Sequence, residues 1–319
     1  MTDSADALHG EALLDPAYAA VLSELPSFTL SDETVALMRE QIGTMVTFEP
    51  SGEVTHTDRT VTGPDGHEIT LRIYRPVVAD GVLPCVYAVH GGGYVMGTYE
   101  MNDARFDAWC SRLGCVGVSV EYRLAPDHQY PAPLEDCYAG LQWVHEHHEH
   151  LKIDPERVGI QGTSAGGGLA AALALLARDR GGPPIAFQVL ECPMLDDRQH
   201  TPSSRLDKLA VWSRESNTYG WQSYLGDLYG QEDVPYHAAP ARAPDVSGLP
   251  PAFVAVGGAD GFRDEDVDYA LRLLQAGVPT ELHVYPGAPH GAQIVPHAPA
   301  ARQWERDVED WVGRQIRRS

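Results

Sequence analysis

The chain has 319 residues, 43% of them hydrophobic, and its 45 acidic side chains outnumber 23 basic ones, which gives a net charge of −22. A chain of this length can bury one large core and carry a small appended segment. The acidic surface would repel phosphate backbones and anionic bilayers, so we expect no nucleic acid and no membrane among the partners.

The N-terminus lacks the pattern of a targeting signal. Residues 1–12 carry acidic side chains where a signal peptide needs a basic region followed by an apolar run. No stretch of the chain reaches the roughly 18 consecutive apolar residues of a membrane span. We therefore predict a soluble, cytoplasmic protein.

The five cysteines show no metal-type spacing and are expected to be buried free thiols: Cys85, Cys110, Cys115, Cys137 and Cys192.

Two N-terminal helices are predicted within residues 1–45, because apolar residues recur at helical spacing on both sides of Pro26. Between residues 54 and 77 the pattern changes to alternation around Gly63-Pro64-Asp65-Gly66. That composition is typical of a turn that joins two antiparallel strands.

Strands and helices alternate from residue 83 to the C-terminal region. The predicted strands cover 83–90, 116–122, 158–161, 185–191, 252–257 and 280–285, and the predicted helices cover 134–150, 165–178, 265–276 and 302–315. Alternation of this kind predicts an α/β fold with a mostly parallel sheet and helices on both of its faces.

Residues 200–248 interrupt this alternation. The segment is rich in Trp, Tyr, Pro and Ser and has only weak helical periodicity, which suits an insertion between two strands. We predict that it forms, together with the helices of residues 1–45, a small helical cap. The catalytic core would then consist of residues 46–199 and 249–319.

The strongest chemical signal is Gly162-Thr163-Ser164-Ala165-Gly166, a G-x-S-x-G sequence between an apolar strand and an Ala/Leu-rich helix. A nucleophilic serine in this motif occupies a sharp strand-to-helix turn, and the glycines allow the backbone to pack closely. The N–H of Ala165 would lie at the helix start, free to face an oxyanion. The alternative is a glycine-rich turn without a catalytic role, because the pentapeptide alone also occurs by chance.

A second signal, His90-Gly91-Gly92-Gly93-Tyr94, directly follows another apolar strand. Consecutive glycines expose backbone N–H groups that can stabilise a tetrahedral oxyanion. We select Gly92 and Gly93, with Ala165 as the third donor and Gly91 as a further candidate, and we expect His90 to brace the loop. A flexible loop and a phosphate cradle are the alternatives, although no G-x-x-x-x-G-K-[ST] pattern follows.

The pairing of these two motifs resembles the hormone-sensitive-lipase-like branch of the α/β-hydrolases, and the similarity covers about residues 65–315. Three further segments resemble motifs of that family: Tyr122-Arg123-Leu124-Ala125-Pro126 with Pro131 and Asp136, Asp260-Gly261-Phe262-Arg263-Asp264-Glu265, and Pro286-Gly287-Ala288-Pro289-His290-Gly291. Thr163 stands where many members have Asp, as in a recognised bacterial subgroup, and Gly261 stands where Pro is common. Neither departure removes a catalytic atom. The resemblance implies an α/β-hydrolase fold and, since members of the subgroup are often dimers, a homodimer.

Asp260 is predicted to be the acid of a Ser-His-Asp triad, because it falls in the loop directly after the strand at 252–257. Asp264 and the acids after it would belong to the next helix, where they cap or solvate its first turn. The chain order of nucleophile, acid and histidine in this fold fits Ser164, Asp260 and His290. Asp197, after the preceding strand, is the structural rival.

His290 is selected among 14 histidines by its place after the last strand, between Pro289 and Gly291. His283 lies within that strand and is expected to be packed. Four other histidines form a polar tract near a helix end that fails the H-E-x-x-H pattern and offers no cysteine partners: His145, His147, His148 and His150. We interpret this tract as solvated surface, and we predict no metal site.

These residues predict a serine esterase. His290 would take the proton of the Ser164 hydroxyl during attack on a small ester, and Asp260 would fix the histidine tautomer. No cofactor or metal is needed for this chemistry. Aromatic side chains could line the substrate pocket or could equally pack the cap against the core, and the substrate-binding candidates are Tyr94, Trp212 and Trp221.

Two other function classes stay open on this scaffold. One is a non-hydrolytic ligand receptor, because the resembling family includes plant hormone receptors that have lost the catalytic histidine, whereas all three triad residues are present here. The other is a lyase or an amidase. For an esterase we predict short- to medium-chain acyl substrates, because the acidic chain has no basic amphipathic helix for a lipid surface. Arg123 and Asp136 are expected to form a structural ion pair.

Overall fold

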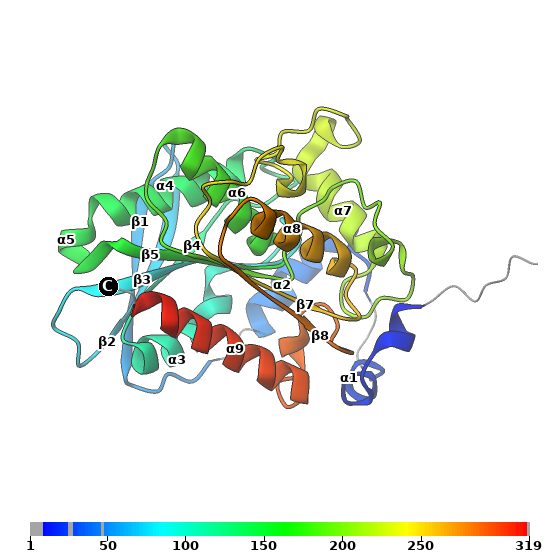
Figure 1. Cartoon of the computed structure of the whole chain (residues 1–319), viewed down its shortest axis with the longest axis horizontal. Coiled ribbons are helices and arrows are strands. Elements are labelled where there is room, and N and C mark those ends of the chain that lie inside the picture. Colours follow the sequence, from blue (N-terminus) through cyan, green and yellow to red (C-terminus); the bar gives the residue numbers. More distant parts are fainter. Residues whose placement is uncertain (1–8, 25–27, 46–47, 318–319) are drawn as a thin grey trace, which may run out of the picture.

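A computed structural model of the chain describes residues 9–24, 28–45 and 48–317 (Figure 1). The predicted breakpoint at Pro26 and most of the acidic N-terminus lie outside these residues. In the described part of the chain, no helix is both long and apolar enough to cross a bilayer.

The central sheet has eight strands in the order β1-β2-β4-β3-β5-β6-β7-β8. Their bounds are β1 Val54–Thr62, β2 Glu68–Pro76, β3 Leu83–Val89, β4 Val116–Glu121, β5 Ile153–Thr163, β6 Gln188–Glu191, β7 Ala252–Gly257 and β8 Thr280–Tyr285. The β1–β2 hairpin is antiparallel, as is the pairing of β2 with β4, and the other neighbours are parallel. The predicted hairpin and the mostly parallel sheet are therefore confirmed.

Helices cover both faces of the sheet (Figure 1). On one face lie α3 (Asp103–Leu113) and α9 (Pro299–Ile316), and on the other lie α4 (Ala132–Glu146), α6 (Ala165–Arg180) and α8 (Arg263–Gln275). The side chains of β3 alternate between two buried clusters, with Val86 and Ala88 on the α3 and α9 side and Tyr87 and Val89 on the other. This alternation follows from the two-residue repeat of a strand, and it makes both faces of β3 apolar.

The predicted elements differ most from the observed ones in three places. Helix α3 was not predicted, because only a few of its side chains are apolar and buried, Phe106, Trp109 and Cys110 among them. Strand β5 begins at Ile153, well before the predicted start, since the intervening residues are polar and include Pro155. The predicted helix at 134–150 is divided at His147 into α4 and α5 (His148–Leu151).

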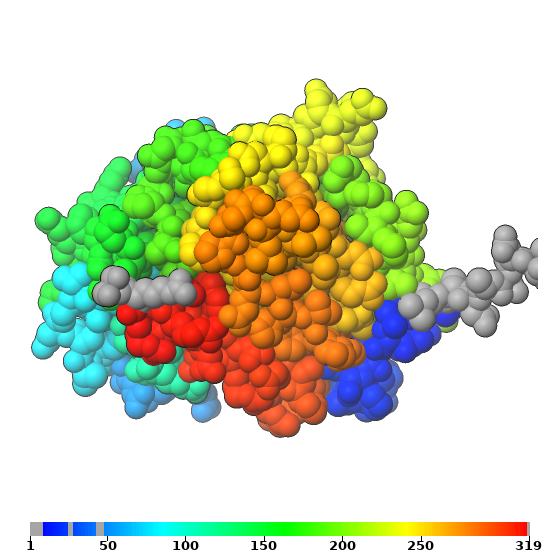
Figure 2. All heavy atoms as spheres, in the orientation of Figure 1, coloured from blue at the N-terminus to red at the C-terminus, as the bar shows by residue number. Residues whose placement is uncertain are grey.

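The chain between the N-terminal helices α1 (Pro16–Leu22) and α2 (Val35–Met45) is hydrogen-bonded to the segment of residues 200–248, which contains α7 (Arg214–Leu225). The N–H of Leu30 donates to Ser216 Oγ at 3.1 Å, and the Tyr219 hydroxyl donates to Asp32 at 3.0 Å. Figure 1 shows α1 and α7 at the same end of the molecule, and the segment of residues 200–248 forms the yellow-green ridge of Figure 2.

Short 3-10 helices complete the described secondary structure: Gly10–Leu13, Tyr99–Asn102, Ser203–Arg205, Gly226–Leu228, Pro240–Arg242 and Ala292–Ile294. All five cysteines are buried and free, as predicted.

Candidate active site

Ser164 occupies a strained turn between β5 and α6. Its φ of 58° and ψ of −124° lie in a region that side chains other than glycine rarely adopt. A Cβ atom at Gly166 would lie 2.2 Å from the carbonyl oxygen of Val89, so this position accepts only glycine without a shift of the backbone. The turn is therefore fixed by contact between the backbones of α6 and β3, and it holds the serine at the carboxyl end of β5.

A continuous chain of hydrogen bonds joins three residues from distant parts of the sequence. His290 Nε2 lies 2.9 Å from Ser164 Oγ, and His290 Nδ1 lies 2.8 Å from Asp260 Oδ2. Because a carboxylate only accepts, Nδ1 carries the proton, and Nε2 is left to accept from the serine hydroxyl. Asp260 Oδ1 also accepts the N–H of Phe262 at 2.9 Å, which fixes the orientation of the carboxylate.

Burial sets the electrostatics of this chain. Asp260 is 1% exposed and His290 6%. Burial alone would lower the pKa of His290, but the charge and hydrogen bond of Asp260, together with the nearby Cys192, raise it well above 6.5. The ring of Phe262 meets the imidazole edge to face, with centroids 5.0 Å apart. The histidine is thus held by an anion on one side and an aromatic ring on another.

The other acids near the end of β7 have different partners. Asp264 Oδ2 accepts the N–H of Ser203 at 2.7 Å, and Asp197 forms a two-pronged ion pair with Arg242 at 2.6 and 2.8 Å. Glu265 accepts the N–H groups of Leu195 and Asp196. Asp260 is therefore the acid that the fold brings to His290, whereas the rival Asp197 is occupied elsewhere.

The glycine loop after β3 folds into a tight turn against the serine. Gly92 has a φ of 119°, and a Cβ atom there would lie 2.1 Å from the carbonyl oxygen of Met96. An ideal Cβ at Gly91 would lie 3.4 Å from Ser164 Cβ, so the loop passes directly beside the predicted nucleophile. His90 is 2% exposed, its Nδ1 donates to the Gly91 carbonyl oxygen at 2.8 Å, and its ring stacks on Tyr122. Burial lowers the pKa of His90 to about 4, which keeps the imidazole neutral inside the loop.

Comparisons with known proteins identify the fold and the family of the chain. Residues 86–294 match a family described as the alpha/beta hydrolase fold. The chain is 35% identical over 303 residues to Esterase LipI of Mycobacterium tuberculosis, covering 90% of this chain and 92% of that protein. It is 37% identical over 299 residues to Carboxylesterase NlhH of the same species, with 90% and 92% covered. The chain belongs to the hormone-sensitive-lipase-like branch of the α/β-hydrolases.

A solved structure of a bacterial heroin esterase superimposes with a TM-score of 0.92 at 40% identity, covering 96% of this chain and 99% of that one. The esterase LipW of Mycobacterium marinum superimposes with a TM-score of 0.87 at 33% identity, covering 97% and 98%. The likeness thus extends over nearly the whole chain.

The three predicted substrate-binding residues lie in different surroundings. The rings of Trp212 and His290 have centroids 6.2 Å apart, and Trp212 packs against Gly93. Tyr94 and Trp221 are instead 1% and 0% exposed, with ring centroids 5.3 Å apart, and the Tyr94 hydroxyl donates to the carbonyl oxygen of Met194. The structure therefore places Trp212 beside the hydrogen-bonded chain, and Tyr94 and Trp221 in a packed aromatic cluster.

Sequence reasoning did not single out Cys192, which follows β6. Donor atoms of Cys192, Asp260 and His290 all lie within 4.8 Å of one another. A thiol, a carboxylate and an imidazole at this spacing could hold a metal, although the Asp260–His290 hydrogen bond already engages two of the donors. No local pattern marks this cysteine, because its proximity to the site depends on the turn after β6.

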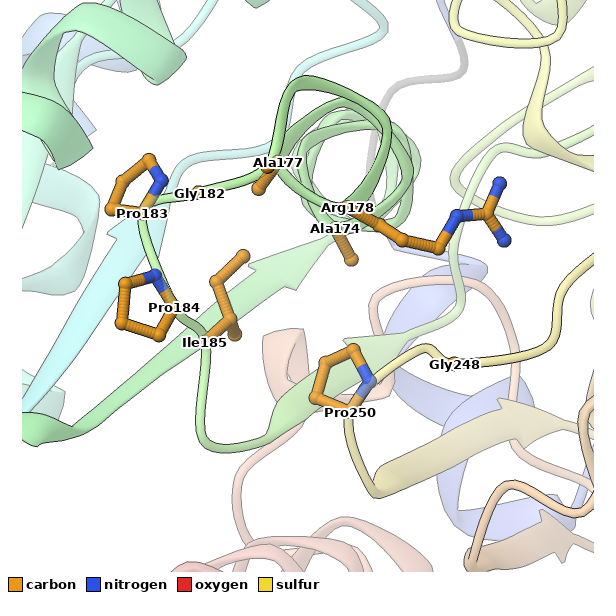
Figure 3. Close-up of a pocket in the computed structure, with 10 residues that line it drawn as sticks. Ala174, Ala177, Arg178, Gly182, Pro183, Pro184, Ile185, Gly248 and Pro250 are labelled. Atoms are coloured by element: carbon orange, nitrogen blue, oxygen red, sulfur yellow. The ribbon is translucent and has the colours of Figure 1, made fainter.

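A cavity of about 380 Å³ lies far from these residues, at the other end of α6 (Figure 3). Its walls include Ala174 and Ala177, roughly 15 to 20 Å along the helix axis from Ser164. Figure 3 shows the side chain of Arg178 extending away from Pro183 and Pro184. This cavity has no contact with the site.

The expected pair of Arg123 and Asp136 is observed, with two side-chain contacts of 2.8 Å.

Proposed function

We propose that the chain is a carboxylesterase that uses Ser164 as nucleophile, His290 as general base and Asp260 as the orienting acid. The observation that carries this proposal is the chain of hydrogen bonds of 2.9 and 2.8 Å through His290, at a strained turn that exposes a serine hydroxyl to it. The esterase and carboxylesterase names of the relatives support the same reaction class.

In this mechanism His290 Nε2 removes the proton of Ser164 as the oxygen attacks the ester carbonyl. The imidazolium that forms is stabilised by the carboxylate of Asp260. His290 then returns the proton to the departing alkoxide, which leaves an acyl group on the serine. Water hydrolyses this acyl-enzyme with the same residues in the same roles.

The oxyanion of each tetrahedral intermediate would be held by backbone N–H groups of Gly92, Gly93 and Ala165, with Gly91 as a further candidate. Ala165 is the first residue of α6, where N–H groups have no partner within the helix. The glycine loop supports the assignment because it lies beside Ser164 Cβ. Donors fixed in this way need no reorganisation when charge develops, which is the source of their effect on rate.

The preferred substrates under this proposal are esters with short to medium acyl chains. Residues 1–45 and 200–248 act as a cap that limits the room for a long chain. Each methylene contributes about 0.8 kcal/mol only while the pocket has space for it. Rates on nitrophenyl esters from acetate to palmitate should rise and then fall with chain length, and emulsified triolein should be a poor substrate. Maximal activity on palmitate would identify a lipase instead.

The test of the function itself is Ser164→Ala, assayed on a panel of nitrophenyl esters and matched amides. Loss of the nucleophile costs roughly a millionfold in turnover in serine hydrolases, and folding should be retained because only one oxygen is removed. Ester turnover by the variant at more than a small fraction of the wild-type rate would refute the assignment. Turnover of amides but not esters by the wild type would point to an amidase.

Two predictions concern the context of the enzyme. We expect a homodimer, which light scattering at micromolar concentration would detect, whereas a single monomer peak would count against it.

A cytoplasmic location likewise stays a prediction, to be checked by cell fractionation.

A further inference from the structure

A large groove opens between α3 and α9, on the face of the sheet opposite α6. Its volume is about 890 Å³, and its inner end is formed by His90, Gly91 and Thr163. It then follows α9 from Ala301 to Glu309, about 12 Å along the helix axis. Both helices appear in the lower part of Figure 1, and α9 contributes the red surface of Figure 2.

The inner end of the groove adjoins the reaction site. Thr163 precedes Ser164, Gly291 follows His290, and both line the groove. Gly91 also lines the groove, and a Cβ atom added to it would lie 3.4 Å from Ser164 Cβ. On the cap side, by contrast, side chains cover the site, since Trp212 packs on Gly93. The groove therefore ends against the backbone next to Ser164 and His290, while the three triad side chains are not among its lining residues.

The walls of the groove combine apolar surface with positive charge that no acidic side chain balances. Met101, Ala104 and Ala108 contribute apolar surface from the α3 side. Arg105 pairs with Glu191 and Glu305, and Arg112 pairs with Glu309, so these charges are balanced.

Two exposed arginines of α9 are different. Within the described part of the chain, the guanidinium group of Arg302 has no hydrogen-bond or ion-pair partner, and that of Arg306 donates only to the neutral Gln303 amide, at 2.6 Å. They stand one helical turn apart on α9, and both line the groove. In a chain of net charge −22, the α9 wall of this groove is thus a local site that favours an anion.

We propose that this groove binds one arm of the ester and selects an arm that ends in a carboxylate, held by Arg302 and Arg306. The substrate class is then a half-ester: a chain or ring with an ester at one end and a free carboxylate at the other. A guanidinium group offers paired donors that match a carboxylate, which gives the contact direction as well as charge. The inference rests on the proposed esterase function and adds the substrate class to it.

The experiment compares esters that differ only in the charge at the far end of one arm. For the acyl arm, the probes are nitrophenyl monoesters of dicarboxylic acids from succinate to sebacate, each beside the ester whose free acid is replaced by a primary amide. For the alcohol arm, they are the butyrate esters of para-hydroxybenzoate and para-hydroxybenzamide. We expect a higher kcat/KM for the charged member of the pair on one arm, and, on the acyl arm, an optimum chain length.

The variant Arg302→Gln/Arg306→Gln should lower the ratio of charged to neutral kcat/KM by about tenfold, the size of one charge-assisted contact. Arg314→Gln is the matched control, because it removes a charge from the same helix at a residue paired with Glu281 outside the groove. The ratio should also fall as salt screens the arginines. A wild type that prefers the amide on both arms, or a ratio unchanged in the double variant, would overturn the proposal.

A second variant tests occupancy of the groove without charge. Ala104 is exposed on α3, so Ala104→Trp should fill the groove without disturbing the core. The ratio of long-arm to short-arm kcat/KM should fall about tenfold if an arm lies there, and an unchanged ratio would contradict it. Failure of the proposed function looks different, because neither neutral nor charged esters would then be hydrolysed in a Ser164-dependent way.

Discussion

The two sides of the site are built from different kinds of contact. On the sheet side, backbone meets backbone, since a Cβ at Gly162 would lie 2.0 Å from the Gly166 carbonyl oxygen. On the cap side, side chains cover glycines, with Leu209 against Gly261 and Trp212 against Gly93. Backbone contacts leave no room for variation, whereas side-chain contacts can be trimmed. We therefore expect changes on the sheet side to remove chemistry or folding, and changes on the cap side to adjust substrate choice.

The largest effect is expected at Asp260, which stands in a sheet-side loop. Asp260→Asn should lower turnover by about four orders of magnitude, because an amide no longer holds the histidine in the reactive tautomer. Asp264→Asn and Asp197→Asn are the controls, since these acids bond to Ser203 and Arg242 instead. Steady-state kinetics of the three variants would decide, and a loss at Asp197→Asn equal to that at Asp260→Asn would contradict the triad.

A second sheet-side change tests folding rather than chemistry. Gly166→Ala would place a methyl group 2.2 Å from one backbone oxygen and 2.4 Å from another, those of Val89 and His90. We expect the free energy of unfolding to fall by about 3 kcal/mol or more, which is in the range of the severest single changes. Denaturant titration gives the value, with Gly81→Ala as control because its Cβ would meet nothing within 4 Å. Equal stability of the two variants would show that the close approach is not rigid.

On the cap side the expected effect is smaller. Trp212→Ala removes the indole that covers Gly93 while leaving the three hydrogen-bonded residues in place. We expect a change in kcat/KM of about tenfold, with the optimum of the acyl series moving to longer chains as space opens. The same nitrophenyl series provides the measurement. A loss as large as that of Asp260→Asn, with no shift in chain-length preference, would mean that Trp212 is part of the reaction machinery.

The smallest expected effect is a displacement of the pH profile. His290 acts as a base only when neutral, and its pKa is raised above 6.5. The kcat/KM should therefore fall as the pH drops through this raised value, so the acid limb lies on the alkaline side of an ordinary histidine. Asp260→Asn should move the limb to lower pH, because the stabilising charge is gone. A limb at or below 6.5 in the wild type would disagree with this account.

The contrast between the two sides also explains how far the sequence could be interpreted. The turn at Ser164, the glycine loop and the loops that carry Asp260 and His290 are local features, and each follows a strand. Spacing and strand ends were therefore enough to predict that Ser164, Asp260 and His290 meet. The parallel sheet could be predicted from the sequence as well, because its strands are continuous apolar runs.

The surroundings of the site were less accessible to such reasoning. Helix α3 was missed because it buries few residues, and the groove beside α9 exists only through the packing of two helices distant in sequence. Tyr94 and Trp221 were candidates for substrate contact, yet they pack together in the core at a ring distance of 5.3 Å. An aromatic residue in a cap gives no local sign of whether its partner is a ligand or another ring, and tertiary contacts decide.

The central claim is that Ser164 carries the acyl group during turnover. Rapid mixing with a nitrophenyl ester, followed by acid quench and peptide mass spectrometry, measures this directly. We predict a burst of nitrophenol equal to the enzyme concentration and a mass increase of one acyl group on the peptide that contains Ser164, both absent in Ser164→Ala. An acyl group on another residue, or steady turnover by Ser164→Ala, would contradict the account.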